Sequence, residues 1–391
     1  MGATNTAKIS RPITAAKPVS LFLMTNTFET GGSERQYSVL ARNLDAQKFG
    51  VHLGCVSHRG ALAAEFAQVP EFPLGGSLFG LRSLRTRLAL RRHLRKHYVD
   101  VAHAFEFYSN LTLIPAARVA RVPVVIGSHR QIGDLMSPAQ FRAQAAALRW
   151  CDAVICNSQA AADSLVAAGI AGKKLAVIGN ALPDELFEPA VPAVPRKPGV
   201  IRVGMVARMN AAYKNHAGFL RIAAQVRKSV PNVEFLLAGD GPLRAELEKQ
   251  AADLGMGNHV IFLGDRRDVS AVLASMDLAV LTSNSESLSN VILEAMAAGL
   301  PVVAYDAGGN KELVNEERGA LVELGNEPLF AAAVVRLASS PEGRGQLGEQ
   351  ARRFVQQKFA LSRVLRRYED LYNLLLARKL GRKRHDAGSS A

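Results

Sequence analysis

Residues 278–314 read LAVLTSNSESLSNVILEAMAAGLPVVAYDAGGNKELV and contain two short apolar runs, LAVLTS and PVVAYD, on either side of an alanine-rich helical pattern. Runs without a polar face are typical of parallel strands that are buried on both sides of a sheet. The segment therefore predicts a strand, a helix from about Asn290 to Ala298 and a second strand, which is the repeating unit of an α/β fold.

The same alternation extends over most of the 391 residues. Further apolar runs are VSLFLMT, VHLGCV, VDVAHAF, VPVVIGS and AVICNS before residue 183, and IRVGMVA, VEFLLAG and VIFLG after residue 199. The stretch 183–199, PDELFEPAVPAVPRKPG, carries five prolines and no helical or strand period, which is typical of an interdomain linker. We predict two doubly wound, Rossmann-like parallel-sheet domains, residues 18–182 and 200–358, joined by this linker.

The two ends of the chain differ from these domains. The pattern SRVLRRYEDLYNLLLARKL predicts a C-terminal helix over about 360–380 with one apolar face to bury. We expect residues 1–17 and 381–391 to be disordered tails, because the apolar run after residue 17 is too short for a signal peptide and the last residues are small or charged.

Composition excludes several classes of protein. No apolar run reaches the roughly 18 residues of a membrane span, and the three cysteines, Cys55, Cys151 and Cys156, show neither disulfide-framework nor zinc-site spacing. We expect a protein of the reducing cytoplasm. The net charge is +14, and residues 1–182 hold 21 Lys and Arg against 10 Asp and Glu, whereas residues 183–358 hold 19 against 21. This asymmetry points to an anionic partner for the first half.

The basic residues concentrate in LRSLRTRLALRRHLRKHY, where no acid occurs between Glu71 and Asp100. We predict peripheral contact of residues 81–98 with an anionic membrane on its cytoplasmic face. The leucines leave two alternatives open, since Leu81, Leu84 and Leu88 share one stripe while Leu90 and Leu94 fall on the far side: a polyanionic glycan acceptor, or a merely solvated helix that packs both sets. Nucleic acid is disfavoured, because aromatic residues make up 6% of the chain and no nucleic-acid motif is present.

The first candidate ligand motif is TNTFETGGSERQ, directly after the first strand. Gly31 and Gly32 would let the backbone approach a phosphate or sugar at a helix N-terminus. A plain tight turn explains the same glycines.

The second motif is VGMVARMNAAYKNH, at the end of the first strand of the second domain. Arg208 and Lys214 would face the cleft, because ligands in open α/β sheets bind beyond the carboxyl ends of the strands. Two such cations suit a leaving diphosphate. Solvated surface cations are the alternative.

The third motif contains Glu286 in the loop before the predicted helix and Glu294 one turn into it. Free amides at Ser289, Asn290 and Val291 would meet a phosphate at the positive end of the helix dipole. Glu294 has apolar neighbours, and a buried carboxylate is costly unless a ligand hydroxyl or a cation satisfies it. A ligand site therefore explains Glu294 better than a chance surface acid.

These motifs together resemble the retaining glycosyltransferases of family 4, with the two-domain GT-B fold. The resemblance runs from about Val19 to Leu375 and rests on GGSER, the Arg208 and Lys214 pair, AGDGPLR, the Glu286 to Glu294 element with EAMAAGLPVVAYDAGGNKELV, and the tyrosine-containing C-terminal helix, which the resemblance expects to cross back to the first domain.

The resemblance implies a role for each motif. Arg208 and Lys214 would clamp the diphosphate of the donor, Glu294 would accept the ribose hydroxyl bonds, and Glu286 would contact the donor sugar. His129 matches the cleft histidine that touches the transferred sugar, so that the implied catalytic set is Glu286, His129, Arg208 and Lys214. The remaining donor-binding positions are Gly31, Gly32, Gly239, Gly241, Gly264, Asp265, Arg266, Leu288, Ser289, Asn290 and Val291. For Gly239 and Gly241 a tight turn before Pro242 is an equal alternative.

The chain departs from the family pattern at two places. Ser287 stands where the family has glycine, which could narrow or reshape the sugar site, and Ala181 rather than glycine follows Asn180. His103, at the end of VDVAHAF, is expected to pack rather than to touch substrate.

The resulting expectation is a cytoplasmic, metal-independent, retaining hexosyltransferase. It would move a hexose or N-acetylhexosamine from a nucleotide diphosphate sugar, a UDP-sugar in first place, to a glycan acceptor, lipid-linked in first place, in cell-surface polysaccharide or glycolipid biosynthesis. We expect no cofactor and no divalent metal, since no D-x-D element occurs at a suitable place. A nucleotide-sugar epimerase of the same fold and a non-catalytic binding subunit are the alternatives.

Overall fold

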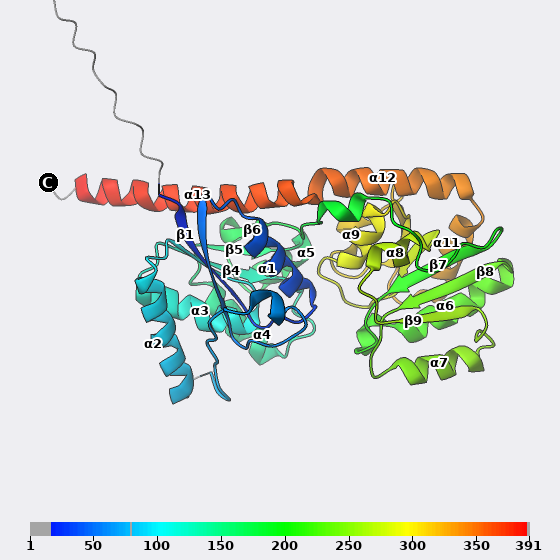
Figure 1. Ribbon diagram of the computed structural model, residues 1–391, viewed down its shortest axis with the longest axis horizontal. Helices are drawn as coiled ribbons and strands as arrows, with labels where there is room; N and C mark the ends of the chain where they lie inside the picture. Colours follow the sequence, from blue (N-terminus) through cyan, green and yellow to red (C-terminus); the bar gives the residue numbers. More distant parts are fainter. Residues whose placement is uncertain (1–16, 79, 389–391) are drawn as a thin grey trace, which may run out of the picture.

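The computed structural model describes residues 17–78 and 80–388. It contains two sheets of six parallel strands each, in two domains that lie side by side (Figure 1). The predicted doubly wound GT-B architecture is confirmed. The expected tail over residues 1–17 falls outside the described residues except for Lys17, and so do residues 389–391 of the expected C-terminal tail.

The first sheet has the strand order β2-β1-β3-β4-β5-β6. Its strands are β1 (Val19–Thr25), β2 (Phe49–Cys55), β3 (Val101–Ala104), β4 (Val124–His129), β5 (Ala153–Cys156) and β6 (Leu175–Val177). Its helices are α1 (Gly32–Asn43), α2 (Leu81–Lys96), α3 (Phe107–Ala120), α4 (Pro138–Leu148) and α5 (Gln159–Ala167).

The second sheet has the order β12-β11-β10-β7-β8-β9. Its strands are β7 (Ile201–Val206), β8 (Val233–Ala238), β9 (Val260–Gly264), β10 (Leu278–Leu281), β11 (Val302–Tyr305) and β12 (Gly319–Val322). Its helices are α6 (His216–Ser229), α7 (Arg244–Asp253), α8 (Val269–Ala274), α9 (Asn290–Ala297), α10 (Asn310–Leu313), α11 (Glu327–Ala338) and α12 (Pro341–Phe359). The helix predicted from Asn290 is α9, which ends one residue earlier than expected.

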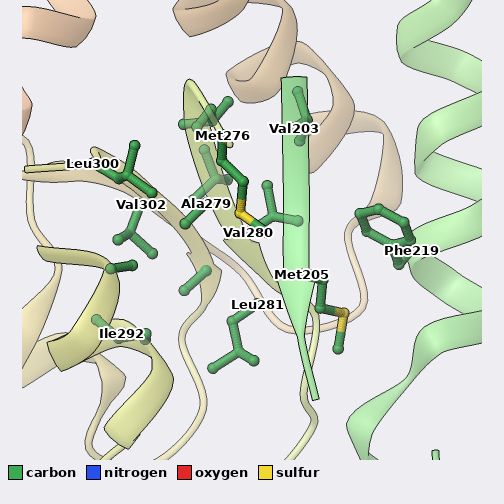
Figure 2. Close-up of a cluster of buried hydrophobic side chains, with 14 of the residues drawn as sticks. Val203, Met205, Phe219, Met276, Ala279, Val280, Leu281, Ile292, Leu300 and Val302 are labelled. Carbon is green, nitrogen blue, oxygen red and sulfur yellow. The ribbon is translucent and has the colours of Figure 1, made fainter. Parts of the chain in front are cut away.

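The core of the second domain surrounds β7, as Figure 2 shows. Met205 is buried on this strand and Met276 is buried beside it. Ile292 of α9 belongs to the same cluster. A Cβ at Gly204 would lie 2.2 Å from Cε of Met276, so the glycine leaves the space that the methionine fills. This packing fixes the base of α9, and the cavity-facing loops extend from it.

The C-terminal helix α13 (Leu361–Gly388) returns to the first domain, as predicted (Figure 1). Its Tyr368 and Tyr372 are buried in the core that contains β1. The hydroxyl of Tyr372 lies 2.8 Å from Nδ1 of His103, and Ser128 Oγ lies 2.8 Å from the other ring nitrogen. His103 is therefore a packed residue without access to the cleft. The expectation of a disordered tail is wrong for residues 381–388, because α13 continues through them.

Residues 183–199, predicted as a linker, instead lie along the second domain. Phe187 is buried in its core, and the amide of Ala193 donates to the carbonyl of Ala271 at 2.9 Å. The chain crosses between the domains just before this stretch, at Leu182, and again at Ala360. The prolines rigidify a strap that covers the domain rather than a hinge.

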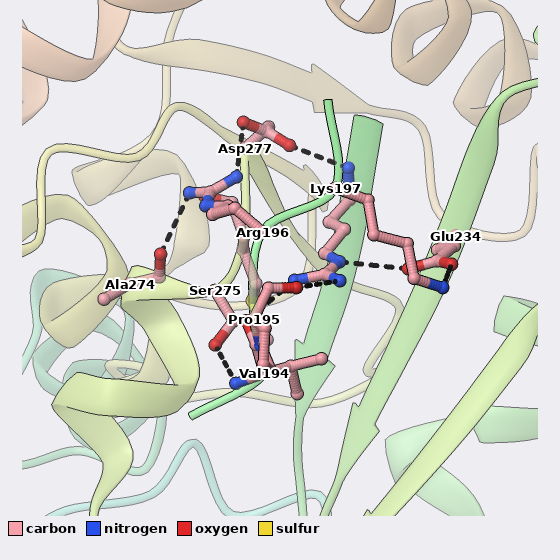
Figure 3. A network of polar contacts seen from close by, with 10 residues as sticks. Val194, Pro195, Arg196, Lys197, Glu234, Ala274, Ser275 and Asp277 are labelled. Atoms are coloured by element: carbon pink, nitrogen blue, oxygen red, sulfur yellow. Dashed lines mark hydrogen bonds and ion pairs between the residues drawn. The ribbon is translucent and has the colours of Figure 1, made fainter. Parts of the chain in front are cut away.

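The strap is held by a buried arginine, whose partners Val194, Pro195 and Glu234 are labelled in Figure 3. Arg202 on β7 is 1% exposed, donates to the carbonyls of Val194 at 2.9 Å and Pro195 at 2.7 Å, and pairs through Nε with Glu234 at 3.1 Å. Lys197 pairs with the other oxygen of Glu234 at 2.5 Å. The guanidinium satisfies two strap carbonyls that would otherwise be without a protein partner.

We predict that Arg202→Ala lowers the free energy of unfolding by about 3 kcal/mol, because it leaves a carboxylate and two carbonyls without their buried partner. Chemical denaturation measures this loss. Lys197→Ala removes a 60% exposed cation from the same carboxylate and should cost less than about 1 kcal/mol. Equal losses for the two variants would contradict a structural role for Arg202.

Candidate active site

A cavity of about 340 Å³ lies between the domains, beyond the carboxyl ends of the strands of both sheets. The loops after β1 and β4 line one side, and the loops after β7, β8, β9 and β10 line the other, together with the start of α9. Of the predicted site residues, the structure brings together around this cavity Gly32, Arg208, Lys214, Gly239, Asp265, Arg266, Glu286, Leu288, Ser289, Asn290, Val291 and Glu294.

Lys214 and Glu286 form an ion pair in the wall of the cavity. The Nζ atom of Lys214 lies 2.6 Å from Oε1 of Glu286. The short turn that carries Lys214 is fixed to the loop after β10, since the amide of Asn284 donates to the carbonyl of Tyr213 at 2.7 Å. The pair therefore places a cation and a carboxylate side by side. A charged ligand could replace either partner of the pair.

Arg208 lines the same wall without a carboxylate partner. Within the described part of the chain its guanidinium makes no hydrogen bond or ion pair, and the residue is exposed to the cavity. An unpaired guanidinium at the carboxyl end of β7 offers a planar fork to an oxyanion.

Glu294 is one turn into α9 and is buried. Its only ion-pair partner among the described residues is Arg35 of α1, whose Nη1 lies 3.2 Å from Oε1. Burial raises the pKa of Glu294, and the Arg35 charge opposes that rise. Because the Oε2 atom makes no hydrogen bond or ion pair with the described residues, Glu294 can still accept bonds from ligand hydroxyls.

The N-terminus of α9 faces the cavity. Ser289 caps it by accepting a bond from the amide of Ile292 at 3.3 Å. The side chain of Asn180, from the segment after β6, donates to Oδ1 of Asn290 at 2.5 Å. A Cβ at Gly32 would lie 2.9 Å from Nδ2 of Asn290, so this glycine permits the close approach of the two domains at the helix end.

Two of the other predicted glycines, Gly239 and Gly241, serve backbone packing. Gly239 and Gly241 have φ values of 138° and 151°, and a Cβ at either would lie within 2.4 Å of a carbonyl oxygen in residues 207–209. Gly241, Gly264 and Gly31 do not line the cavity, whereas Gly239 does. The tight-turn alternative accounts for Gly239 and Gly241, because both allow the loop after β8 to lie against the loop that carries Arg208.

Asp265 and Arg266 lie at the rim. Arg266 pairs with Asp268 at 2.5 Å, while Asp265 makes no hydrogen bond or ion pair within residues 17–78 and 80–388. Both residues line the cavity, and their role in binding the nucleobase stays a prediction.

His129 does not lie in the cleft, which corrects the prediction of a cleft histidine. Its ring is 0% exposed and does not line the cavity. Nδ1 accepts from Gln144 at 2.7 Å, and Nε2 lies 3.1 Å from Ser164 Oγ. Strand alternation turns His129 toward α4 and α5, and Arg130 lines the cavity instead.

Ser287, which replaces the family glycine, is turned toward the first domain. Its hydroxyl donates to Oδ1 of Asn157 at 2.6 Å and lies 3.2 Å from Ser158 Oγ. Nearby, both oxygens of Glu312 accept from the amides of Gln159 and Ala160, at 2.9 and 3.0 Å. The serine therefore adds a contact between the domains.

Four polar residues among the cavity-lining positions that sequence reasoning missed are Arg35, Arg130, Asn157 and Asn180. Arg35 belongs to the GGSER motif, and Arg130 follows His129 directly. Both residues are therefore adjacent in sequence to predicted site residues. Asn157 and Asn180 follow β5 and β6, and their place at strand ends was the available signal.

Comparisons with known proteins agree with this geometry. Residues 30–186 match the family described as "Glycosyltransferase Family 4", and residues 200–340 match "Glycosyl transferases group 1". The chain belongs to the family 4 glycosyltransferases. These matches cover both sides of the cavity, so the family assignment includes the first domain as well as the second.

Individual relatives are distant. The chain is 27% identical to the putative glycosyltransferase EpsF of Bacillus subtilis over 359 residues, which covers 84% of this chain and 88% of EpsF. It is 25% identical to the Escherichia coli UDP-Gal:alpha-D-GlcNAc-diphosphoundecaprenol alpha-1,3-galactosyltransferase, over 75% of this chain and 80% of that enzyme. The match with putative glycosyltransferase EpsD of B. subtilis, 29% identical, spans only 41% of this chain and 42% of EpsD.

Among solved structures, Anabaena HepE in complex with UDP superposes with a TM-score of 0.79 at 23% identity, covering 91% of this chain and all of HepE. The lipopolysaccharide outer core galactosyltransferase WaaB superposes with a TM-score of 0.74 at 15% identity, over 90% of this chain and 98% of WaaB. At these identities the similarity establishes the GT-B fold.

Burial lowers the pKa of His129 to about 4. The unfolded chain therefore binds a proton between about pH 6.5 and pH 4 that the folded protein does not bind, and stability falls as the pH falls through this window. We predict that wild type loses about 2 kcal/mol more than His129→Gln between pH 7 and pH 5, measured by urea unfolding. Identical pH profiles would mean that the imidazole is solvated, as a cleft histidine would be.

Proposed function

We propose that this protein is a retaining glycosyltransferase that moves a hexose or N-acetylhexosamine from a nucleotide diphosphate sugar to a glycan acceptor. The observation that carries the proposal is the cavity wall of the second domain. There an unpaired Arg208, the Lys214–Glu286 pair and the buried Glu294 surround the N-terminus of α9. This combination offers positive charge for a diphosphate and carboxylates for sugar and ribose hydroxyls.

A UDP-sugar is the donor we favour. HepE was solved with UDP and with UDP-glucose, and the E. coli relative is named for a UDP-Gal donor. That relative also acts on a diphosphoundecaprenol-linked sugar, which supports a lipid-linked acceptor in polysaccharide or glycolipid synthesis. The donor would occupy the side of the second domain and the acceptor the side of the first.

The proposed chemistry needs neither a protein nucleophile nor a divalent metal. Arg208, Lys214 and the α9 amides would stabilise the leaving diphosphate. The acceptor hydroxyl would attack the same face of the sugar that the diphosphate leaves, and a donor phosphate oxygen would take its proton. Glu286 and Glu294 would hold hydroxyls, since each is already engaged by a cation.

We predict that saturating UDP raises the melting temperature by about 5 °C, with or without magnesium, and that GDP, ADP and TDP do so less. Lys214→Ala should abolish the shift, because it removes a phosphate partner and leaves Glu286 unpaired. Thermal shift assays measure both, with Lys228→Ala, an exposed cation of α6, as the matched control. A shift that requires magnesium would contradict the metal-independent mechanism.

Activity and nucleotide-binding assays distinguish a transferase from an epimerase and from a non-catalytic binding subunit. Glu294→Ala should abolish transfer while its melting temperature in the absence of nucleotide stays near that of wild type. Sugar epimerised from donor alone would establish an epimerase instead, and failure to bind any nucleotide would favour a binding subunit.

We further propose that α2 contacts an anionic membrane at its cytoplasmic face. The helix buries Leu90 and Leu94, whereas Leu81, Leu84 and Leu88 are 76%, 53% and 40% exposed. Only one of the two leucine sets therefore packs inward. This disagrees with the alternative of a solvated helix that packs both sets. Exposed arginines flank the outer leucines: Arg82, Arg85 and Arg92. No helix among the described residues has the length and apolarity to cross a bilayer.

For this surface we predict that Leu81→Gln combined with Leu84→Gln lowers affinity for phosphatidylglycerol-containing vesicles about tenfold, because two apolar side chains no longer enter the interface. Vesicle cosedimentation measures the change. Leu374→Gln, which alters an exposed leucine of α13, is the control. Binding of wild type that is equal on neutral phosphatidylcholine vesicles, or insensitive to salt, would contradict the proposed electrostatic contact.

A further inference from the structure

Arg130 is the cavity cation whose partners are all neutral. It follows β4 at the carboxyl end of the first sheet and lines the cavity from the side of the first domain. One Nη donates to Oδ1 of Asn180, the other lies 3.3 Å from the hydroxyl of Tyr368, and the guanidinium lies 5.9 Å from the centre of the Phe105 ring. These contacts fix the direction of the fork without neutralising its charge.

No carboxylate of the described residues lies within ion-pair distance of Arg130, in contrast to three other cavity cations. Arg35, Lys214 and Arg266 each pair with an acid. Arg208 is also unpaired, but it belongs to the second domain and faces the proposed donor side.

The acid whose charge acts on Arg130, Glu106, offers little compensation. Burial and the neighbouring Glu34 raise the pKa of Glu106, which disfavours its charged form. Its Oε2 accepts from the amide of Asn26 at 3.1 Å, which holds it beside β1. Arg130 therefore faces the cavity with neutral hydrogen-bond partners and no acid at ion-pair distance among the described residues.

We propose that Arg130 binds an anionic group, a phosphate or a carboxylate, carried by the acceptor. This inference rests on the proposed function, because it takes the first-domain side of the cavity as the acceptor side. A guanidinium with free N–H groups in a fixed plane matches the paired oxygens of either anion. The diphosphate of the donor already has Arg208 and Lys214 on the opposite wall, so the charge of Arg130 is additional to what that group needs.

Binding to defined probes in the presence of UDP tests this. The probes are decyl-diphosphate-linked N-acetylglucosamine for the phosphate source, decyl glucuronide for the carboxylate source, and decyl N-acetylglucosaminide as the neutral reference. We expect wild type to bind at least one charged probe about tenfold more tightly than the neutral one. Arg130→Met should remove that preference, and the probe that shows it identifies the source.

Three variants separate contact from structure. Arg121→Met removes a cation at the opposite end of β4 and should leave the preference unchanged. Arg130→Lys keeps the charge without the fork and should retain part of the preference. UDP affinity of Arg130→Met should equal that of wild type, which also shows that the variant is folded.

Two results would overturn the inference: equal affinity of wild type for all three probes, or a loss of UDP affinity in Arg130→Met as large as in Arg208→Met. The second would assign Arg130 to the donor diphosphate. Failure of wild type to bind UDP at all would instead refute the proposed function, so the two failures are distinguishable.

Discussion

The relation between the two domains depends on a pair of backbone hydrogen bonds where the chain crosses between them. The amide of Leu182 donates to the carbonyl of Phe359 at 2.8 Å, and the amide of Leu361 donates to the carbonyl of Leu182 at 2.9 Å. Both crossings therefore run side by side, and α13 can dock on the first domain only in the orientation that this pairing allows. Burial of Tyr372 against His103 then fixes that orientation. The cavity lies between the two domains that these contacts join.

The sequence was sufficient for the architecture and for the second-domain wall of the cavity. Continuous apolar strands predict parallel sheets, and the spacing of Arg208, Lys214, Glu286 and Glu294 places them at strand ends and at one helix terminus. These are local signals, since each depends on residues within one strand–loop–helix unit.

What sequence reasoning missed depends on contacts between distant residues. Arg35 and Glu294 are 259 positions apart, and Ser287 and Asn157 are 130 apart, so no local pattern pairs them. The prediction that His129 lies in the cleft was wrong for a different reason. Its position at a strand end was predicted correctly, but the side on which a side chain emerges depends on strand parity, and a shift of one residue exchanges the buried face and the cleft face. The packing of residues 183–199 on the second domain could not be predicted, because proline-rich composition is common to flexible linkers and to straps held by a buried cation such as Arg202.

One contact that joins the domains uses a group that the proposed donor would need. Glu294 is held by Arg35 through Oε1, and the loop that carries Glu286 is tied to the first domain through Ser287. Ribose hydroxyls can bind the Oε2 atom of Glu294 while Oε1 keeps its pair with Arg35, and the bonds from Ser287 and Glu312 involve no group proposed to contact the donor. Donor binding would therefore leave the contacts between the domains in place.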